Sequence, residues 1–208
     1  MAQYVQYGCG LCAPTSWKNY DASPTLLLQK VPLISLIASK KVKFPSNVIY
    51  GDIVRGLPGI KANSCDAVFC SHTLEHLSLI DFYKALNNTY RILKPGSIFR
   101  CILPDLEFAA KNYIQEIGIK SEASIKFMKA TMLGVEYRSN SIIDMLISLF
   151  GNSSHLWMWD QFSLEKSLRD VGFSKVRKCV FQDSTEKAFL DVEDEGRYWG
   201  AIAFEAIK

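Results

Sequence analysis

Four short signals, each placed just after an apolar segment, follow one another in a fixed order along the chain. The first segment ends in Gly8-Cys9-Gly10, the second in Asp21, the third in Gly51-Asp52 and the fourth in Ser71-His72. Open α/β sheets bind ligands outside the carboxyl ends of their strands. A glycine turn lets the backbone approach a ligand closely, and two successive acids can accept hydrogen bonds from a ribose and from the edge of a base. The series therefore predicts a site for a ligand that contains a nucleoside.

Each signal also has an ordinary structural interpretation. The Gly8-Cys9-Gly10 turn lacks the third glycine of a dinucleotide fingerprint, because Ala13 stands at that position. Asp21 could begin a helix as its N-cap, and Asp52 could be a turn residue. Three such coincidences in the right order are less easily explained, so we favour a ligand site in which Ile53 lies against the base.

Strand and helix patterns alternate up to about residue 103 and would position these signals. Strands are expected at 4–7, 17–20, 47–50, 66–70 and 98–103, and amphipathic helices at 25–39 and 78–93. This alternation predicts a doubly wound α/β fold with a mainly parallel sheet and helices on both faces. Two late strands, at 175–181 and 198–207, are joined by an acidic connection that we expect to be solvated, and they predict an antiparallel last strand.

Polar residues and glycines mark the ends of two of the expected helices. Ser78 with Asp81 three residues later resembles a capping box. Asp160 or Ser163 can cap a later helix, which Gly172 would close. These signals fix where two helices should begin and where one should end.

Composition limits the class of protein. A chain of 208 residues favours one domain, 1–208. The net charge is +3 and the densest basic run, 40–43, is too small for a nucleic-acid footprint. No apolar stretch approaches the roughly 20 residues of a membrane span, and no signal peptide is evident. Cys9, Cys70 and Cys101 lie in or beside apolar strands, which favours reduced thiols in a cytoplasmic protein.

The same residues resemble the class I S-adenosylmethionine-dependent methyltransferase family. The similar segments are, in chain order, Tyr7-Gly8-Cys9-Gly10 (its first glycine motif), Asp21, Gly51-Asp52-Ile53 (its adenine-contacting segment), 65–77, 91–96, 157–160, 163–164 and 171–173. The resemblance covers nearly the whole chain. Within the family it points to a small bacterial subgroup of the methyltransferase type-11-like kind, often associated with cell-surface glycan synthesis.

The resemblance implies a seven-stranded Rossmann-like sheet and S-adenosylmethionine as the cofactor. The implied function is methyl transfer to a small-molecule acceptor, which in this subgroup could be glycan-related. The residues implied in cofactor binding are Tyr7, Gly8, Cys9, Gly10, Asp21, Ala22, Asp52, Ile53, Ser71 and His72.

Three departures from the family pattern leave alternatives open. Tyr7 stands where the family usually has an acid, and Cys12 stands where it often has a further glycine. The family's helix before the first strand is missing, which leaves the site more open or closed by a partner subunit. A non-catalytic subunit that binds S-adenosylmethionine for regulation or assembly is therefore the main alternative. An enzyme that uses the same sheet to bind NAD or a nucleotide sugar is a weaker alternative.

A mostly helical insertion is expected at about 106–159, after the fifth strand. Its start lies at the ligand-bearing edge of the sheet, and segments of this length are often lids or binding elements. We expect it to shape the acceptor pocket, with candidate lining residues Tyr113, Tyr137, His155 and Trp157. Residues 142–150 are apolar enough to be core or a contact within a homo-oligomer.

The chemistry implied is an in-line displacement, to which the enzyme mainly contributes alignment. A general base is needed only if the acceptor must lose a proton. The candidates are His72, His155 and Asp105, and a histidine is preferred because its pKa lies near neutral pH.

Two short motifs point elsewhere. The pentapeptide 72–76 matches the H-x-x-E-H pattern of a zinc protease, but it lacks a third ligand on a nearby helix. We therefore expect no metal site, and expect His76 to pack and hydrogen-bond at the start of a helix. Cys9 and Cys12 have C-x-x-C redox spacing, but the segments that follow do not fit a thioredoxin.

Overall fold

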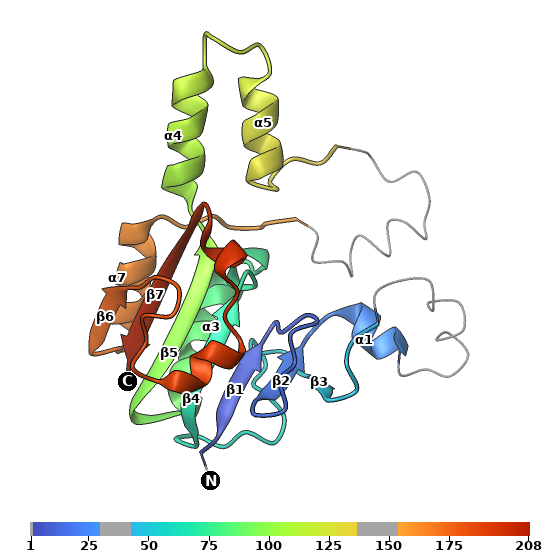
Figure 1. Ribbon diagram of the computed structural model, residues 1–208, viewed down its shortest axis with the longest axis vertical. Coiled ribbons are helices and arrows are strands. Elements are labelled where there is room, and N and C mark those ends of the chain that lie inside the picture. Colours follow the sequence, from blue (N-terminus) through green and yellow to red (C-terminus); the bar gives the residue numbers. More distant parts are fainter. Residues whose placement is uncertain (1, 30–42, 137–153) are drawn as a thin grey trace.

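The computed structural model describes residues 2–29, 43–136 and 154–208. At its centre lies a seven-stranded sheet with the order β3-β2-β1-β4-β5-β7-β6 (Figure 1). The first five strands are parallel, and β7 is antiparallel to both of its neighbours. The predicted fold class is therefore confirmed. The strands are β1 (Tyr4–Tyr7), β2 (Lys18–Asp21), β3 (Val48–Tyr50), β4 (Cys65–Ser71), β5 (Leu93–Pro104), β6 (Lys175–Lys178) and β7 (Ala201–Ile207).

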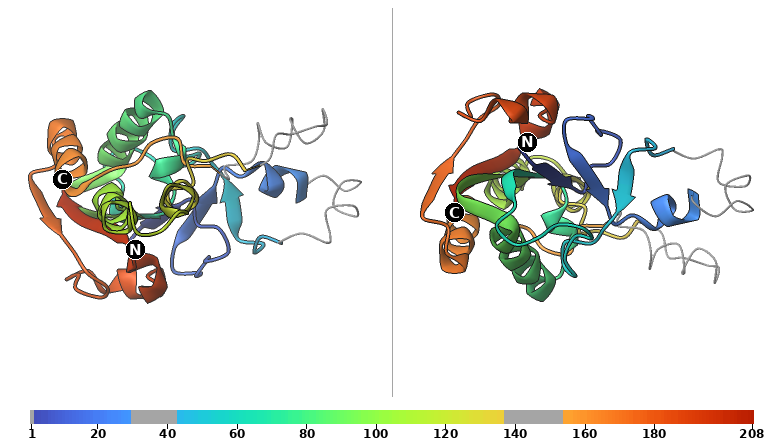
Figure 2. Two further views of the ribbon diagram at one scale, coloured as in Figure 1. Left: turned by 90° about the horizontal axis from the view of Figure 1, so that it is seen from above. Right: turned by 90° about the horizontal axis from the view of Figure 1, so that it is seen from below.

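Helices and short 3₁₀ turns cover the two faces of the sheet. Alternate residues of β4 point to opposite faces, as the pleat of a strand requires: Val68 packs in the cluster that contains α3 and α7 residues, and Phe69 packs with Phe189 of η2 on the other face. Figure 2 shows α3 and α7 on one side of the sheet and η2 and η3 on the other. The helical elements are α1 (Pro24–Gln29), η1 (Leu74–His76), α3 (Leu79–Ile92), α4 (Leu106–Glu116), α5 (Ala123–Ala130), α7 (Gln161–Val171), η2 (Lys187–Asp191) and η3 (Glu195–Tyr198).

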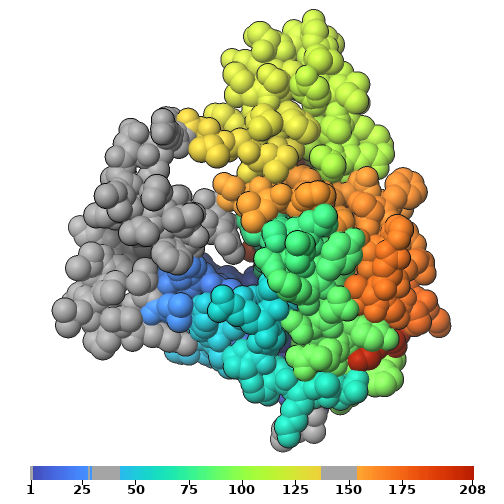
Figure 3. Space-filling model, turned by 180° about the vertical axis from the view of Figure 1, so that it is seen from behind, coloured from blue at the N-terminus to red at the C-terminus, as the bar shows by residue number. Residues whose placement is uncertain are grey.

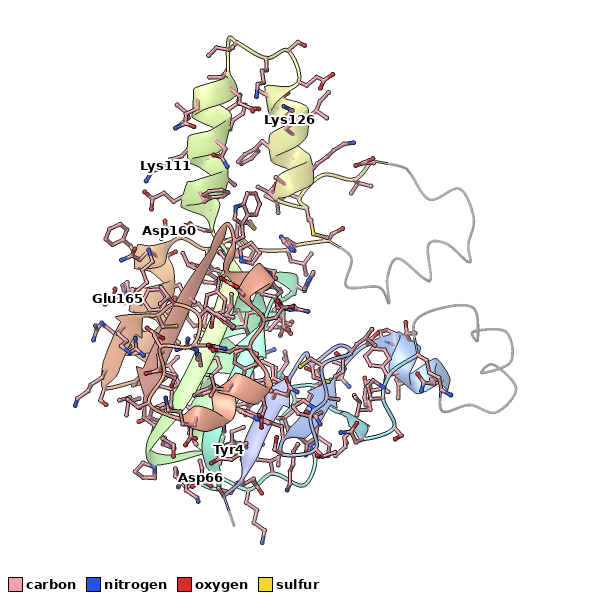
Figure 4. All side chains as sticks on the ribbon, in the orientation of Figure 1. Tyr4, Asp66, Lys111, Lys126, Asp160 and Glu165 are labelled. Carbon is pink, nitrogen blue, oxygen red and sulfur yellow. The ribbon has the colours of Figure 1, made fainter. Side chains whose placement is uncertain are left out.

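The predicted helix ends are confirmed where side chains cap them. The Ser78 hydroxyl accepts a hydrogen bond from the Asp81 N–H at the start of α3. Asp160 and Ser163 form a reciprocal capping box at the start of α7 (Figure 4), and Gly172 ends that helix with φ +116°. These ends depend on contacts within four residues, which is why the sequence alone could locate them.

The predicted boundaries differ from the structure in three places. β5 begins at Leu93, directly after α3, because Leu93 pairs with Cys65 of β4. The late strands are shorter than predicted: β6 ends at Lys178 rather than 181, and β7 begins at Ala201 rather than 198, because Tyr198 belongs to η3. Only 24–29 of the helix predicted at 25–39 is described, and the apolar stretch 142–150 lies outside the described residues.

The acidic connection between β6 and β7 is not fully solvated, contrary to expectation. The Arg100 side chain, on β5, is fully buried and pairs with Asp183, Glu193 and Glu205. A buried guanidinium needs such partners to offset its lost hydration. Arg100 therefore ties the 180–198 segment to the sheet and so determines where η3 lies.

The expected helical insertion forms a hairpin of α4 and α5 that projects from the carboxyl end of β5 (Figures 1 and 3). No residue of α4 is buried. The two ends of the insertion meet at a parallel bridge between Asp105 and Trp159. The indole of Trp159 then stacks on Phe82 of α3 with ring centroids 4.0 Å apart. The base of the hairpin is thus anchored in the core while its helices stand outside it.

No helix in the described part of the chain is both long and apolar enough to cross a bilayer.

Candidate functional site

A cavity of about 260 Å³ lies at the carboxyl ends of the first four strands, and we call it the strand-end cavity. Its lining residues are Tyr7, Gly8, Gly10, Asp21, Ala22, Ser23, Gly51, Asp52, Ile53, Ser71, His72, Thr73, His76, Leu77 and Arg197. All the predicted cofactor residues except Cys9 are therefore brought together. The parallel arrangement explains this, because the ends of β1, β2, β3 and β4 meet at one edge of the sheet.

The two glycines of the first turn serve different purposes. Gly8 has φ +64°, and a Cβ there would lie 1.9 Å from the Thr73 hydroxyl, so glycine is needed for packing. Gly10 has φ +54°, and a Cβ there would meet no protein atom within 4 Å. Gly10 borders open space in the cavity, as a backbone approached by a ligand would.

Asp21 combines a structural role with capacity for a ligand. The side chain is 8% exposed, and it accepts hydrogen bonds from the Gly10 N–H (3.0 Å) and the Ser23 N–H (2.7 Å). A carboxylate has about four acceptor positions, so two are left for ribose hydroxyls. Asp52 likewise accepts from the Val54 N–H at 2.9 Å and keeps acceptor capacity toward the cavity. The turn roles expected for these acids are real, and they coexist with a binding role.

Tyr7 and Cys9 direct their side chains away from the cavity. The Tyr7 hydroxyl lies 3.1 Å from the Thr89 hydroxyl of α3, inside the core. Cys9 is buried with Leu26 and Val48, and burial raises the pKa of its thiol to about 12. A thiol that holds its proton so firmly does not support the redox interpretation of the C-x-x-C motif.

His72 lies at the turn after β4 in a strained conformation. Its φ is +49°, which a side chain with a Cβ rarely adopts. The ring Nε2 is 2.9 Å from the Arg197 carbonyl, and Nδ1 is 3.5 Å from a carboxylate oxygen of Glu75. Burial lowers the pKa of His72, but the Glu75 carboxylate and the Arg197 carbonyl outweigh it, so the pKa is raised overall. Strain of this kind persists only where the surroundings enforce it, and it is concentrated at functional sites.

A second cavity, of about 490 Å³, lies between the hairpin and the sheet edge, and we call it the hairpin cavity. Predicted residues His72, Asp105, Tyr113 and His155 line it, together with Phe108, Phe127, Met132, Met158 and Trp199 among others. Trp157 does not line it and is 42% exposed. Tyr137 lies outside the described residues. His72 is the one residue that lines both the strand-end and the hairpin cavities in the described part of the chain.

The three predicted proton acceptors differ in their surroundings. Asp105 caps α4, accepting from the Glu107 N–H at 2.8 Å. His155 is 7% exposed, and burial lowers its pKa despite the nearby Glu75 carboxylate. Burial therefore shifts His155 toward its neutral form, whereas the raised pKa of His72 shifts it toward the imidazolium form.

Sequence reasoning missed several residues of the site. His76 and Leu77 lie in the segment that carried the resemblance, but they were not assigned to the cavity. Arg197 comes from η3, which the burial of Arg100 positions, so no local signal identified it. Glu75 is buried beside His72 and His155, a position that only the folded chain reveals.

Comparisons with known proteins agree with this arrangement. A methyltransferase from Archaeoglobus fulgidus that depends on S-adenosylmethionine is similar at 16% identity and TM-score 0.52, over 100% of this chain and 86% of that one. One from Thermotoga maritima is similar at 18% identity and TM-score 0.50, over 100% of this chain and 83% of that one. Haemonchus contortus phosphoethanolamine N-methyltransferase 2, bound to S-adenosylhomocysteine, is similar at 13% identity and TM-score 0.50. This match covers 100% of this chain and 48% of that one. At such identities these similarities establish the fold.

The sequence comparisons are more specific. No protein of curated function matches this chain in sequence. Residues 5–101 match the family model described as a methyltransferase domain, and this range contains the predicted cofactor residues. The family model that matches is therefore that of a methyltransferase domain, and the solved methyltransferases share the fold of this chain.

Proposed function

We propose that this protein transfers a methyl group from S-adenosylmethionine to a small-molecule acceptor. The observation that carries the proposal is the position of His72, which lines both cavities. A nucleoside ligand in the strand-end cavity and a second molecule in the hairpin cavity would meet at this residue. Two adjoining cavities are what a transfer reaction needs, whereas a subunit that only binds the cofactor needs one.

The residues of the strand-end cavity fit the cofactor. The free space at Gly10 admits the amino-acid part of the ligand, and Asp21 and Asp52 keep acceptor positions for the ribose and the base. When bound, S-adenosylmethionine supplies a methyl group on a positively charged sulfur. The chain's own contribution is to hold donor and acceptor in line, which lowers the barrier by removing translational and rotational freedom beforehand.

The hairpin cavity indicates the chemistry of the acceptor. Phe108, Tyr113, Phe127 and Trp199 give it aromatic walls, and Asn112 and Lys126 add polar groups. Figure 4 shows Lys126 on α5, and its Nζ lies 3.5 Å from a carboxylate oxygen of Glu116 on α4. Lys111 lies on the outer side of α4, away from α5. Aromatic walls with a few polar groups suit an acceptor that has a ring or an apolar body and a hydroxyl or amine. A glycan-related acceptor of this description is the finer form of the proposal.

His155 is the better placed proton acceptor if the reacting group is a hydroxyl. It borders the hairpin cavity and burial shifts it toward its neutral form, whereas the Asp105 carboxylate is engaged at the start of α4. In this scheme 1–208 acts as one catalytic domain, and the 106–159 insertion holds the acceptor.

The cysteines bear on the compartment. All six lie in the described ranges and are free thiols, and five of them are buried. Free, buried thiols fit a reducing compartment, so we propose that the protein works in the cytoplasm. A homo-oligomer stays a prediction.

Calorimetric titration tests the cofactor, with S-adenosylhomocysteine and NAD compared on the same protein. We expect binding of the first only, weakened by about 1–3 kcal/mol in Asp21→Ala because polar partners lose their acceptor. Asp170→Ala, on the exposed surface of α7, is the matched control and should bind as the wild type does. An affinity for S-adenosylhomocysteine no better than for NAD would refute the proposal.

A transfer assay tests the reaction. The protein is incubated with S-adenosylmethionine labelled in its methyl group and with a panel of phenols, amines and hydroxylated sugars. We expect label to appear in at least one acceptor class. Tight cofactor binding without transfer to any member of the panel would favour the non-catalytic alternative.

A further inference from the structure

The carboxylate of Glu75, in η1, is buried. The side chain is 1% exposed, and neither carboxylate oxygen has a hydrogen-bond partner among the described residues. A buried carboxylate without hydrogen bonds is costly, since nothing replaces the water it has lost. Such a group in a native protein usually indicates an ion or water that satisfies it.

Two other side chains with nitrogen donors complete a cluster around this acid. A carboxylate oxygen of Glu75 and one ring nitrogen each of His76 and His155, all possible metal ligands, lie within 4.8 Å of one another. His155 is 7% exposed, and its Nδ1 also lacks a partner in the described part of the structure. The His155 Nε2 is 3.9 Å from Glu75, too far for a hydrogen bond. The His72 Nδ1 lies 3.5 Å from a carboxylate oxygen of Glu75, and neither histidine contact gives that carboxylate a hydrogen bond among the described residues.

Main-chain hydrogen bonds hold the two halves of the cluster together. The N–H groups of Leu156 and Trp157 donate to the Glu75 carbonyl at 2.8 and 3.1 Å. The Nδ1 of His76 is 3.0 Å from the Ser154 carbonyl, which orients the ring and leaves Nε2 for a ligand. A histidine that binds a metal commonly donates its other N–H to a carbonyl in this way.

We propose that Glu75, His76 and His155 bind a zinc ion. Two imidazoles and one carboxylate are a known donor set for zinc sites that keep one open position. Tetrahedral zinc places its ligand atoms about 3.4 Å apart, and the three ligand atoms here already lie within 4.8 Å of one another. Calcium and magnesium prefer oxygen donors and fit two imidazoles poorly.

This set differs from the one that the H-x-x-E-H pattern suggested. The pattern pairs His72 with His76, but the Nε2 of His72 is engaged by the Arg197 carbonyl and His72 is outside the cluster. The ligand that the sequence lacked is His155, which is 79 residues beyond His76 in the chain. The expectation of no metal site rested on the absence of a third ligand, and the fold supplies one.

The position of the cluster suggests how the ion would be used. His76 lines the strand-end cavity and His155 lines the hairpin cavity, so the ion would lie where the two adjoin. A zinc ion there would lower the pKa of an acceptor hydroxyl and take over the role given above to His155. This use rests on the proposed function, whereas binding of the ion does not.

The test is zinc binding by the whole chain, measured without any acceptor. Protein stripped with a chelator is titrated with Zn²⁺ in a calorimeter, and cobalt is substituted to report the donor set by its visible absorption. We expect one ion per chain. Loss of a direct ligand in His155→Gln, His76→Gln or Glu75→Gln should weaken zinc at least about a hundredfold, since even outer-shell changes cost 10- to 100-fold.

His72→Gln is the matched control, because it removes the neighbouring imidazole but no proposed ligand. Its zinc affinity should stay within about tenfold of that of the wild type, which is the smallest loss expected when a residue next to a metal ligand is changed. Circular dichroism confirms that each variant folds. No stoichiometric zinc in the wild type, or loss in His72→Gln with retention in His155→Gln, would overturn the proposal. Either result would leave the cofactor titration unaffected, so the two proposals fail separately.

Discussion

The strand-end cavity and the hairpin cavity are built in different ways. The strand-end cavity is lined by turns of the sheet, with Asp21 and Ile53 buried and Gly10 hydrogen-bonded to Asp21. The hairpin cavity is lined by α4, which has no buried residue, and by α5. Ile114 of α4 is 68% exposed, and Ile119 in the connection between the two helices is 81% exposed. The walls of the strand-end cavity belong to the packed core, whereas the walls of the hairpin cavity lie largely outside the core.

Under the proposed function, this difference matches what each cavity would recognise. A fixed cofactor is best held by turns whose geometry the sheet enforces. An acceptor that differs between relatives is best held by a segment whose sequence can change without disturbing the core. Substitutions in the two regions should therefore separate cofactor binding, acceptor use and stability.

The largest effect is expected where the hairpin joins the core. Trp159→Ala removes an indole that is 3% exposed and stacked on Phe82. Loss of a buried aromatic side chain should lower the free energy of unfolding by about 3–5 kcal/mol. Trp157→Ala, two residues earlier and 42% exposed, should cost about 1 kcal/mol or less. Urea denaturation measures both, and equal losses would show that the base of the hairpin is not anchored as described.

The next effect concerns the glycine turn. Gly10→Val should reduce affinity for S-adenosylhomocysteine about a hundredfold or more, about 2.8 kcal/mol, because the side chain enters the space left for the ligand. Gly96→Val is the control, since Gly96 also has positive φ (+80°) and open space at its Cβ but lies at the start of β5. Both variants carry the same backbone strain. Similar affinities for the two in calorimetry would mean that strain, not the cavity, is responsible.

A smaller effect is expected from the hairpin itself. Tyr113→Ala removes a ring that lies 5.4 Å from that of Phe127 across α4 and α5. Methyl transfer to an acceptor found with the panel should fall about tenfold, or 1.4 kcal/mol. Cofactor affinity should stay within about threefold, under 1 kcal/mol. If cofactor affinity falls in parallel with transfer, the two cavities are not separable.

The smallest effect concerns the cap of α7. Hydrogen bonds from Ser163 lower the pKa of Asp160 in the folded state. Its stabilising contribution is therefore complete above the unfolded pKa of about 3.9 and is lost as pH falls through the lower folded value.

At pH 7, Asp160→Ala should lower the free energy of unfolding by about 1 kcal/mol, and by less near pH 3. Asp160→Asn keeps an N-cap acceptor and should remove the pH dependence while it keeps most of the stability. Denaturation at the two pH values measures this. A cost for Asp160→Ala that is the same at both would show that the charge plays no part.

Much of the fold was predictable because its signals are local. Caps such as Ser78 and Asp160 act within one helical turn, and the strand-end residues need only the parallel order of the strands to meet. Boundaries were less predictable, since β5 begins at Leu93 through pairing with Cys65, which is 28 residues away. The burial of the acidic connection depended on Arg100, whose charge could be paired in many ways.

By itself the sequence determined the class of sheet, the strand ends at which the strand-end cavity lies, and many of the residues that line it. Repeating periods and turn residues encode these features over short distances. Only the tertiary structure decided that His72 borders two cavities, that Arg197 reaches the site, and that His155 lies beside Glu75 and His76. These depend on contacts between segments about 80 residues apart or more, such as the hydrogen bond from the Leu156 N–H to the Glu75 carbonyl and the ion pairs of Arg100, which no local pattern records.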